Sequence, residues 1–373
     1  MTDQQGEQRF GVSTLELFFD LVFVFAITQV TAMIAAEPTA TGLVRGVLLL
    51  ALVWWSWVAF TWVGTTVRAD LGLPALVFGG AMASMLVAAI ALPQGFSGTR
   101  VAWIAVLAYL AVRVMHLGLF LALGRGTPGL TAAAARLGIG VGVGAALLLV
   151  GTAIGGGAQL ALVALAVVAD FAGALLGGGR GWVVNVEHFA ERHGLIVIIA
   201  LGESLIALGL AATGTDLGAG VLVVVLLGFG LSAAIWLRYF ARDATPLEHA
   251  LAAATGAARA RLARDAFSYL HLPIVLGIVL VALALKKGVA AVDADGAGAA
   301  LHGVGAVALG VGVPLILTAL IAVRVRARCG VPTGLVVALA VAAAVAIGAA
   351  SLPLLAVLLV QAAVVAAVAL RRA

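Results

Sequence analysis

Apolar runs long enough to cross a bilayer recur along the whole chain, separated by short polar or glycine-rich segments. A helix needs about 20 such residues to span the hydrocarbon core. The pattern predicts an all-α polytopic transmembrane bundle. Its spans, about twelve in number, are expected near residues 13–36, 42–63, 73–92, 101–123, 131–151, 158–178, 193–212, 219–240, 267–285, 299–323, 334–349 and 352–370. The last two require the chain to fold back near residues 350–353.

Composition and charge agree with a membrane protein. Hydrophobic residues make up 64% of the chain and charged residues 10%, whereas about a quarter of a soluble domain is charged. Lys and Arg accumulate in cytoplasmic loops. With both termini placed inside, sixteen of the 21 basic residues fall in inner segments and Arg113 falls in mid-span; the outer loops hold Arg45, Arg100, Lys286 and Lys287. The net charge of +5 is thus explained by topology and lipid contact, and nucleic acid is not an expected partner.

Two acids mark the first apolar run, which follows a short cytoplasmic tail at residues 1–12. Glu16 and Asp20 lie four residues apart and share a helical face. Asp20 would sit roughly 12 Å into the membrane, at 1.5 Å per residue. The run is too long and too polar for a cleaved signal peptide, so we expect a retained span. Ionisable groups at such depth are functional candidates by default.

The densest polar cluster comes just before the seventh run. We expect residues 179–192 to form a cytoplasmic lead-in that carries a gate or coupling cluster, followed by a buried acid, Glu203. Arg192 and Glu203 are about 16 Å apart along a helix, so each needs a partner elsewhere. Gly202 and Gly209 share a face and would let another helix approach Glu203 closely. The cluster comprises Glu187, His188, Glu191, Arg192 and His193.

Other candidate positions lie in the second, fourth, fifth and sixth runs. Arg113 and His116 share a helical face in the fourth run, and Asp170 lies in the sixth. The fifth run carries alternate glycines at residues 138–144, a spacing that favours close helix packing. The second run contains four tryptophans, which indicate an interfacial aromatic belt or, alternatively, the lining of a cavity. They are Trp54, Trp55, Trp57 and Trp62.

An internal repeat is suggested by the two acidic spans. Asp20 and Glu203 each follow an Arg-x-Gly segment by nine residues, at an offset of 183, and Trp62 is echoed by Trp236 at an offset of 174. Residues 13–178 and 193–373 would then be two parallel six-helix repeats. This overlay predicts that Asp20 and Glu203 lie at equal depth near the central axis.

Several segments carry a family resemblance. EHFAERHGLIVIIALGESL, STLELFFDLVFVFAITQ, VRVMHLGLF and YLHLPIVLGIVL resemble the bacterial low temperature requirement A (LtrA) family. That resemblance implies a multi-pass protein of the bacterial inner membrane, with a poorly defined molecular activity. Residues 18–28, FFDLVFVFAIT, also resemble the first-helix FSD signature of endolysosomal and bacterial potassium channels. Phe19 replaces the serine of that signature, and in those channels the helix lines the pore.

Two transport functions follow from these residues. In a proton- or cation-coupled carrier, desolvated acids bind and release the coupling ion; in a cation channel, the first helix lines the pore and Ile27 is an apolar gate. Discontinuous helices would favour the carrier, and a continuous first helix lining a symmetric pore would favour the channel. The ion- or substrate-binding candidates are Asp20, Glu203, Glu16, Arg113, Asp170 and His116.

A non-transporting bundle held by buried salt bridges is the remaining alternative. We disfavour it because four buried acids would face a single arginine, Arg113. An enzyme is not expected: His188 and His193 are five residues apart and do not share a helical face, and no HExxH motif or cysteine-rich ligand set is present. No cofactor or metal is predicted. The expected partners are the lipid bilayer and a small ion or small-molecule substrate, with homo-oligomers left open.

Overall fold

The computed structural model describes residues 11–125, 128–176 and 181–371, in which all regular secondary structure is helical. Within this part of the chain, ten helical segments are long and apolar enough to cross a membrane, and two further apolar helices near the C-terminus are shorter. The helices are α1 (Thr14–Ala36), α2 (Ala40–Gly64), α3 (Gly72–Ala91), α4 (Arg100–Leu123), α5 (Pro128–Ile154), α6 (Gly156–Leu176), α7 (Val186–Ala212), α8 (Ala219–Arg238), α9 (Thr245–Ala253), α10 (Gly256–Leu262), α11 (His271–Asp295), α12 (Gly303–Ala327), α13 (Thr333–Ile347) and α14 (Leu354–Leu370).

Both helices that carry the predicted acids begin at a side-chain cap. Ser13 and Glu16 form a capping box on α1, in which Ser13 Oγ accepts from Glu16 N and Glu16 Oε2 accepts from Ser13 N. Asn185 caps α7 by accepting from the backbone N–H of His188. These local caps set the rotational phase of Glu16 and His188 on their helices.

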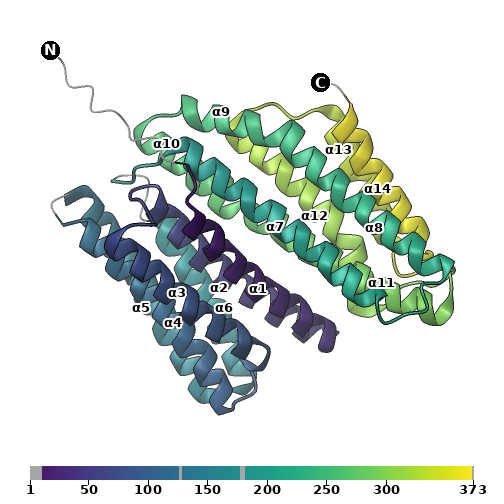
Figure 1. Ribbon diagram of the computed structural model, residues 1–373, viewed down its shortest axis with the longest axis horizontal. Coiled ribbons are helices and arrows are strands. Elements are labelled where there is room, and N and C mark those ends of the chain that lie inside the picture. Colours follow the sequence, from purple (N-terminus) through teal and green to yellow (C-terminus); the bar gives the residue numbers. More distant parts are fainter. Residues whose placement is uncertain (1–10, 126–127, 177–180, 372–373) are drawn as a thin grey trace.

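The helices form two bundles with the same neighbour pattern (Figure 1). In the first, α1 packs against α2 and α3, α3 against α4, α4 against α5, and α6 against α5 and α2. In the second, α7 packs against α8 and α11, α11 against α12, α12 against α13, and α14 against α13 and α8. These contacts correspond one to one between the bundles; in addition, α2 packs against α4 in the first bundle and α8 against α11 in the second.

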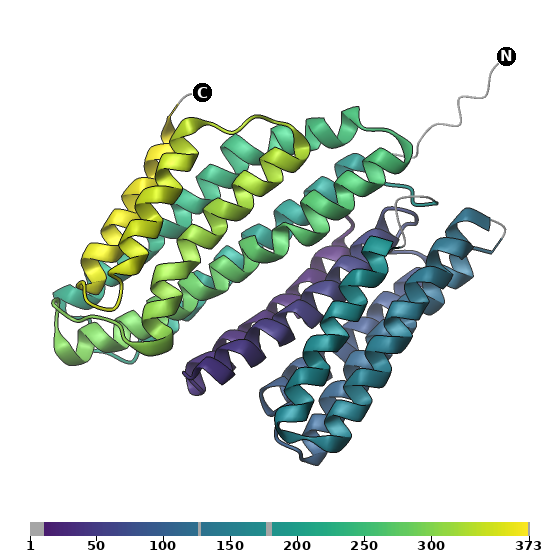
Figure 2. The same ribbon diagram turned by 180° about the vertical axis from the view of Figure 1, so that it is seen from behind.

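The bundles meet where α1 and α2 contact α7 and α11, an interface that we call the seam. α1 and α7 run side by side in the same direction, because Asp20 meets Arg192 and Thr28 meets Glu203 further along both helices. α2 and the segment containing α11 are the most enclosed of the ten long helical segments described. Seen from behind, α1 and α2 again separate α7 and α11 from α3 to α6 (Figure 2).

Several boundaries differ from those predicted. α7 begins at Val186, so half of the expected lead-in at 179–192 is helical, and residues 177–180 lie outside the described part. Lys286 and Lys287, assigned to an outer loop, belong to α11. The segment after α8 is mostly helical: two π-helices, η2 (Tyr239–Ala244) and η3 (Ala263–Tyr269), flank α9 and α10. The chain turns between α13 and α14 as expected.

Polar contacts explain why the segment after α8 is ordered. Asp243 of η2 accepts from Arg238 Nη2 at 2.9 Å and from Arg324 Nη1 at 2.8 Å, which ties η2 to α12. Asp265 of η3 pairs with Arg264 and with Arg326 of α12. These partners are distant in sequence, so the polar residues appeared to belong to a loop.

The glycine predictions had mixed outcomes. Gly140 packs on Gly173 and the Ala169 carbonyl of α6, where a Cβ would lie 3.1 Å from the carbonyl oxygen. Close packing through the fifth run is therefore confirmed. The expected close approach beside Glu203 is wrong, since a Cβ at Gly202 or Gly209 would meet open space.

Candidate functional site

Arg192 bridges two buried carboxylates across the seam. Its Nη1 donates to Glu16 Oε1 at 2.9 Å and its Nη2 donates to Asp20 Oδ1 at 2.5 Å. All three side chains are at most 2% exposed. Charge-assisted bonds of this kind are among the strongest in proteins, so this bridge joins the two bundles directly.

Two further side chains complete the group. His188 Nε2 lies 2.9 Å from Glu16 Oε1, and the indole Nε1 of Trp57 donates to Asp20 Oδ1 at 2.7 Å. The guanidinium of Arg192 also lies over the Trp57 ring, 5.6 Å from its centroid, a favourable cation–π distance. We call Glu16, Asp20, Trp57, His188 and Arg192 the seam cluster.

Glu16 has two roles, one for each carboxylate oxygen. Oε2 caps α1, while Oε1 receives Arg192 and His188. Gly64, at the end of α2, provides the space for this arrangement, because a Cβ there would lie 2.4 Å from Glu16 Oε1 and 3.0 Å from His188 Cε1. Neither Gly64 nor Trp57 was singled out from the sequence as a partner of the acids.

The seam cluster does not balance its own charge. Two carboxylates face one guanidinium, so with a neutral His188 the cluster carries one net negative charge. Asp20 Oδ2 is buried and has no hydrogen-bond partner among the described residues. An uncompensated buried charge is costly. One added positive charge would make the net charge of the cluster zero.

An open cavity lies beside Glu16 at the end of the bundle where α1 begins. A cavity of about 810 Å³, counting its open mouth, is lined by Ser13, Glu16, Arg68 and Asp70. Arg68 and Asp70 form an exposed ion pair at this mouth, and that pair lowers the pKa of the Asp70 carboxyl below its ordinary value. The seam cluster therefore lies next to an open cavity at this end of the molecule.

Arg113 and Asp170 form a separate pair on the other side of α2. Arg113 Nη2 donates to Asp170 Oδ1 at 2.8 Å, and Nη1 donates to the Trp55 carbonyl at 3.4 Å. His116 lies one turn further along α4, fully buried between Phe60 and Phe120. This pair is electrically neutral, in contrast to the seam cluster.

Glu203 belongs to neither group. Its polar neighbours are Thr28 of α1 and Lys286 of α11. Asp20 lies level with Arg192, eleven residues before Glu203, so the two acids are not at equal depth as the overlay predicted. Thr28 is about 12 Å along α1 from Asp20, and the buried Phe23 and Ile27 lie between them.

The predicted gate cluster divides among three places. His188 and Arg192 face α1, whereas His193 packs among Trp57, Phe267 and His271 in the aromatic core. Glu191 accepts from the backbone N–H of Val12. Glu187 and Glu191 line a separate open cavity of about 900 Å³.

The tryptophans of α2 do not form an aromatic belt at the interface. Trp54 Nε1 donates to the backbone carbonyl of Ser268 in η3, and Trp62 Nε1 donates to the hydroxyl of the same residue. Trp57 binds Asp20. Trp55 and Trp62 line a cavity, which was the alternative interpretation. α2 therefore uses its tryptophans to bridge the two bundles.

Comparison with known proteins decides the family. The sequence matches the family described as "Bacterial low temperature requirement A protein (LtrA)" over residues 11–370. The chain belongs to the LtrA family. It is also 29% identical, over 284 residues, to an uncharacterized protein of Rhizobium meliloti (strain 1021), covering 72% of this chain and 67% of the relative. No solved structure matches the LtrA chain.

Proposed function

We propose that this LtrA protein is a proton-coupled secondary carrier of the bacterial inner membrane, with the seam cluster as its coupling site. The observation that carries the proposal is the charge imbalance: two buried carboxylates share one arginine beside a histidine. One proton would neutralise the cluster. Losing that proton would leave a charge in a low-dielectric seam, which favours a rearrangement of the two bundles.

A proton suits this site better than a metal cation. The guanidinium of Arg192 already occupies the space between Glu16 and Asp20. A cation bound by both carboxylates would have to displace Arg192, whereas a proton can be accepted at Asp20 Oδ2, which is unpartnered in the described part of the chain, without changing the packing.

The architecture supports a carrier with two related halves. The matching neighbour patterns of α1–α6 and α7–α14 agree with parallel six-helix repeats, whose interface is the usual place for a coupling site. The partners Glu16 and His188, and Asp20 and Arg192, are each 172 residues apart. This separation is close to the offset of 174 residues between Trp62 and Trp236. We therefore propose it as the offset between the two repeats, in place of 183. In this proposal α13 and α14 are two short spans, which makes twelve.

A cation channel is the second candidate, because α1 is unbroken from Thr14 to Ala36 and lies at the seam. A channel would conduct without saturation, following the membrane voltage, whereas a carrier saturates. A purely structural seam cluster is the third candidate, since Arg192 binds both acids.

The deciding experiment uses purified protein in liposomes with an internal pH dye and a potassium-loaded lumen. We expect proton flux for the wild type and none above protein-free liposomes for Asp20→Asn, because the cluster is then neutral without a proton. Glu203→Gln is expected to abolish flux as well, by removing the third buried acid of α1 and α7. Asp216→Asn, which changes an exposed carboxylate between α7 and α8, is the matched control.

Three outcomes would contradict the proposal. Wild-type flux in a folded Asp20→Asn protein would remove the seam cluster from the coupling path. Absence of wild-type flux under proton or potassium gradients would favour the structural interpretation. Flux that rises without saturation would select the channel instead.

The proposed orientation, with both termini inside, can be tested with the single cysteine. Cys329 lies between α12 and α13, and burial raises the pKa of its thiol, so labelling should be done at alkaline pH. An impermeant maleimide should label Cys329 in opened membranes and not in intact cells. Ser97→Cys in a Cys329→Ser background, at the opposite end, should be labelled in intact cells. The reverse result would invert the topology.

A further inference from the structure

A cavity separate from the seam cluster lies between the first bundle and η3. It has about 620 Å³ of atom-free space, including its mouth. Its walls come from the end of α2, the later part of α4, the start of α5 and the end of α6, together with Trp182, α10 and η3. Because α2 returns antiparallel to α1, the cavity lies toward the same end of the molecule as the start of α1.

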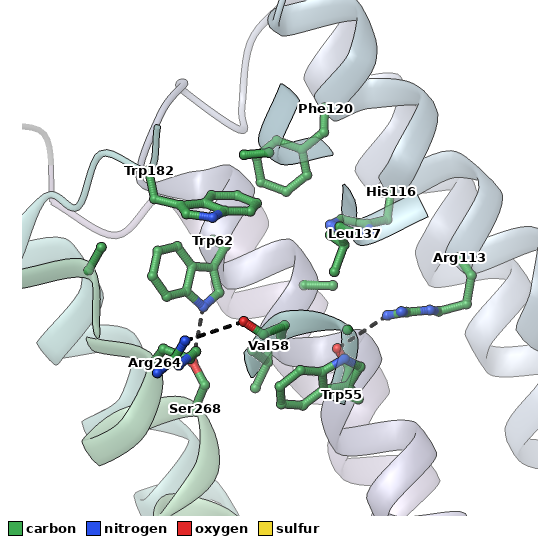
Figure 3. Close-up of a pocket in the computed structure, with 15 residues that line it drawn as sticks. Trp55, Val58, Trp62, Arg113, His116, Phe120, Leu137, Trp182, Arg264 and Ser268 are labelled. Carbon is green, nitrogen blue, oxygen red and sulfur yellow. Dashed lines mark hydrogen bonds between the residues drawn. The ribbon is translucent and has the colours of Figure 1, made fainter. Parts of the chain in front are cut away.

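Aromatic rings form much of its surface. Trp62 and Trp182 lie 5.3 Å apart by ring centroids, and Phe120 lies 5.2 Å from Trp182. Trp55 closes the opposite wall beside Arg113 (Figure 3). Large flat side chains of this kind favour a planar apolar ligand.

The charges of the lining are all of one sign. Arg113 and Arg264 line the cavity, and none of the described residues that line it is acidic. Arg113 is balanced by Asp170. Arg264 is only partly balanced, because its partner Asp265 is shared with Arg326. The cavity therefore has an excess of positive charge on the η3 side.

His116 supplies an unsatisfied polar group. It is fully buried in the cavity wall, and neither Nδ1 nor Nε2 has a hydrogen-bond partner among the described residues. Nε of Arg113, one turn away, is also unpartnered in the described structure. Buried polar groups are nearly always hydrogen-bonded, so an unpartnered pair of donors here indicates a missing acceptor.

We propose that this cavity binds a small organic anion with a planar aromatic body. Its acidic group accepts hydrogen bonds from the imidazole of His116 and interacts with the arginines, while its ring lies among the tryptophans. An aromatic carboxylate has this chemistry. The proposal does not depend on transport, since it concerns binding alone.

The test is isothermal titration calorimetry of the full chain in detergent with 2-naphthoate and the uncharged 2-naphthalenemethanol. Wild type should bind the acid at least about tenfold more tightly than the alcohol, the scale of a hydrogen bond to a charged group. His116→Leu and Arg264→Gln should each remove most of this preference. Arg264→Lys keeps the positive charge and should retain part of the preference for the acid. It controls for loss of the hydrogen bonds from Arg264 Nη1 to the carbonyls at the end of α6.

Two cavity-filling variants separate binding from partition into micelles. Ala59→Leu adds bulk to this cavity and should abolish binding of the acid. Ala105→Leu fills a different cavity of about 540 Å³ that has no charged lining residue, and should bind like the wild type. Equal affinity for acid and alcohol, or unchanged binding in Ala59→Leu, would overturn the proposal. Asp20→Asn should keep binding even if it abolishes flux, so the two proposals fail independently.

Discussion

Arg113 and Arg192 are equally buried, but their surroundings differ. Arg113 meets one carboxylate inside the first bundle, whereas Arg192 meets two carboxylates and a histidine between the bundles. Both arrangements remove charges from water at a large cost, which pairing has to offset. Only the pair of Arg113 and Asp170 has a net charge of zero.

The contrast shows that burial of an ionisable group is a weak functional signal by itself. Charge balance and location carry more information. A neutral pair within a bundle can be satisfied in one conformation. An unbalanced group at an interface between bundles is sensitive to one added proton, so the seam cluster is the better candidate for a coupling site.

The largest expected effect comes from removing each arginine. Arg192→Met should lower the free energy of unfolding by about 5 kcal/mol, since two buried carboxylates lose their partner, and Arg113→Met by about 3 kcal/mol. Chemical unfolding in detergent measures both. Arg45→Met, which breaks a partly exposed pair with Glu37, should cost about 0–1 kcal/mol. A greater loss for Arg113→Met than for Arg192→Met would reverse the comparison.

Much of the fold could be predicted from local pattern. The apolar runs that became α1 to α6 matched the observed helices closely because span length is a local property. The start of α7 could not be predicted in this way. Residues 186–192 contain four ionisable side chains, of which only His188 and Arg192 are buried, and both of these face the acids of α1.

That boundary error changed the functional argument. With Arg192 assigned to a cytoplasmic segment, the buried acids outnumbered the buried arginines four to one. Counting Arg192 inside the bundle changes that ratio to four acids and two arginines, and Glu203 has neither arginine as a partner. The burial of the four acids is confirmed, but Trp57 and Gly64 carry no sequence signal for the acids they meet, since those contacts span long stretches of chain.

A smaller difference is expected between two tryptophans of α2. Trp57→Phe loses the donor to Asp20, whereas Trp55 meets Arg113 only through its backbone carbonyl. Both substitutions shrink an indole, so Trp57→Phe should cost about 1.5–3 kcal/mol more than Trp55→Phe, the contribution of a hydrogen bond to a charged group. The same unfolding experiment measures the difference. Equal costs would show that Asp20 does not depend on Trp57.

The smallest effect should come from replacing the neutral pair as a unit. Arg113→Met/Asp170→Leu should leave the free energy of unfolding within about 1 kcal/mol of the wild type or raise it, because apolar side chains avoid the desolvation cost. Flux should persist. Arg192→Met/Asp20→Leu should be costly and inactive, since Glu16 still lacks a guanidinium. If the Arg113/Asp170 double variant folds and loses flux, that pair belongs to the mechanism and charge balance is not what separates the two sites.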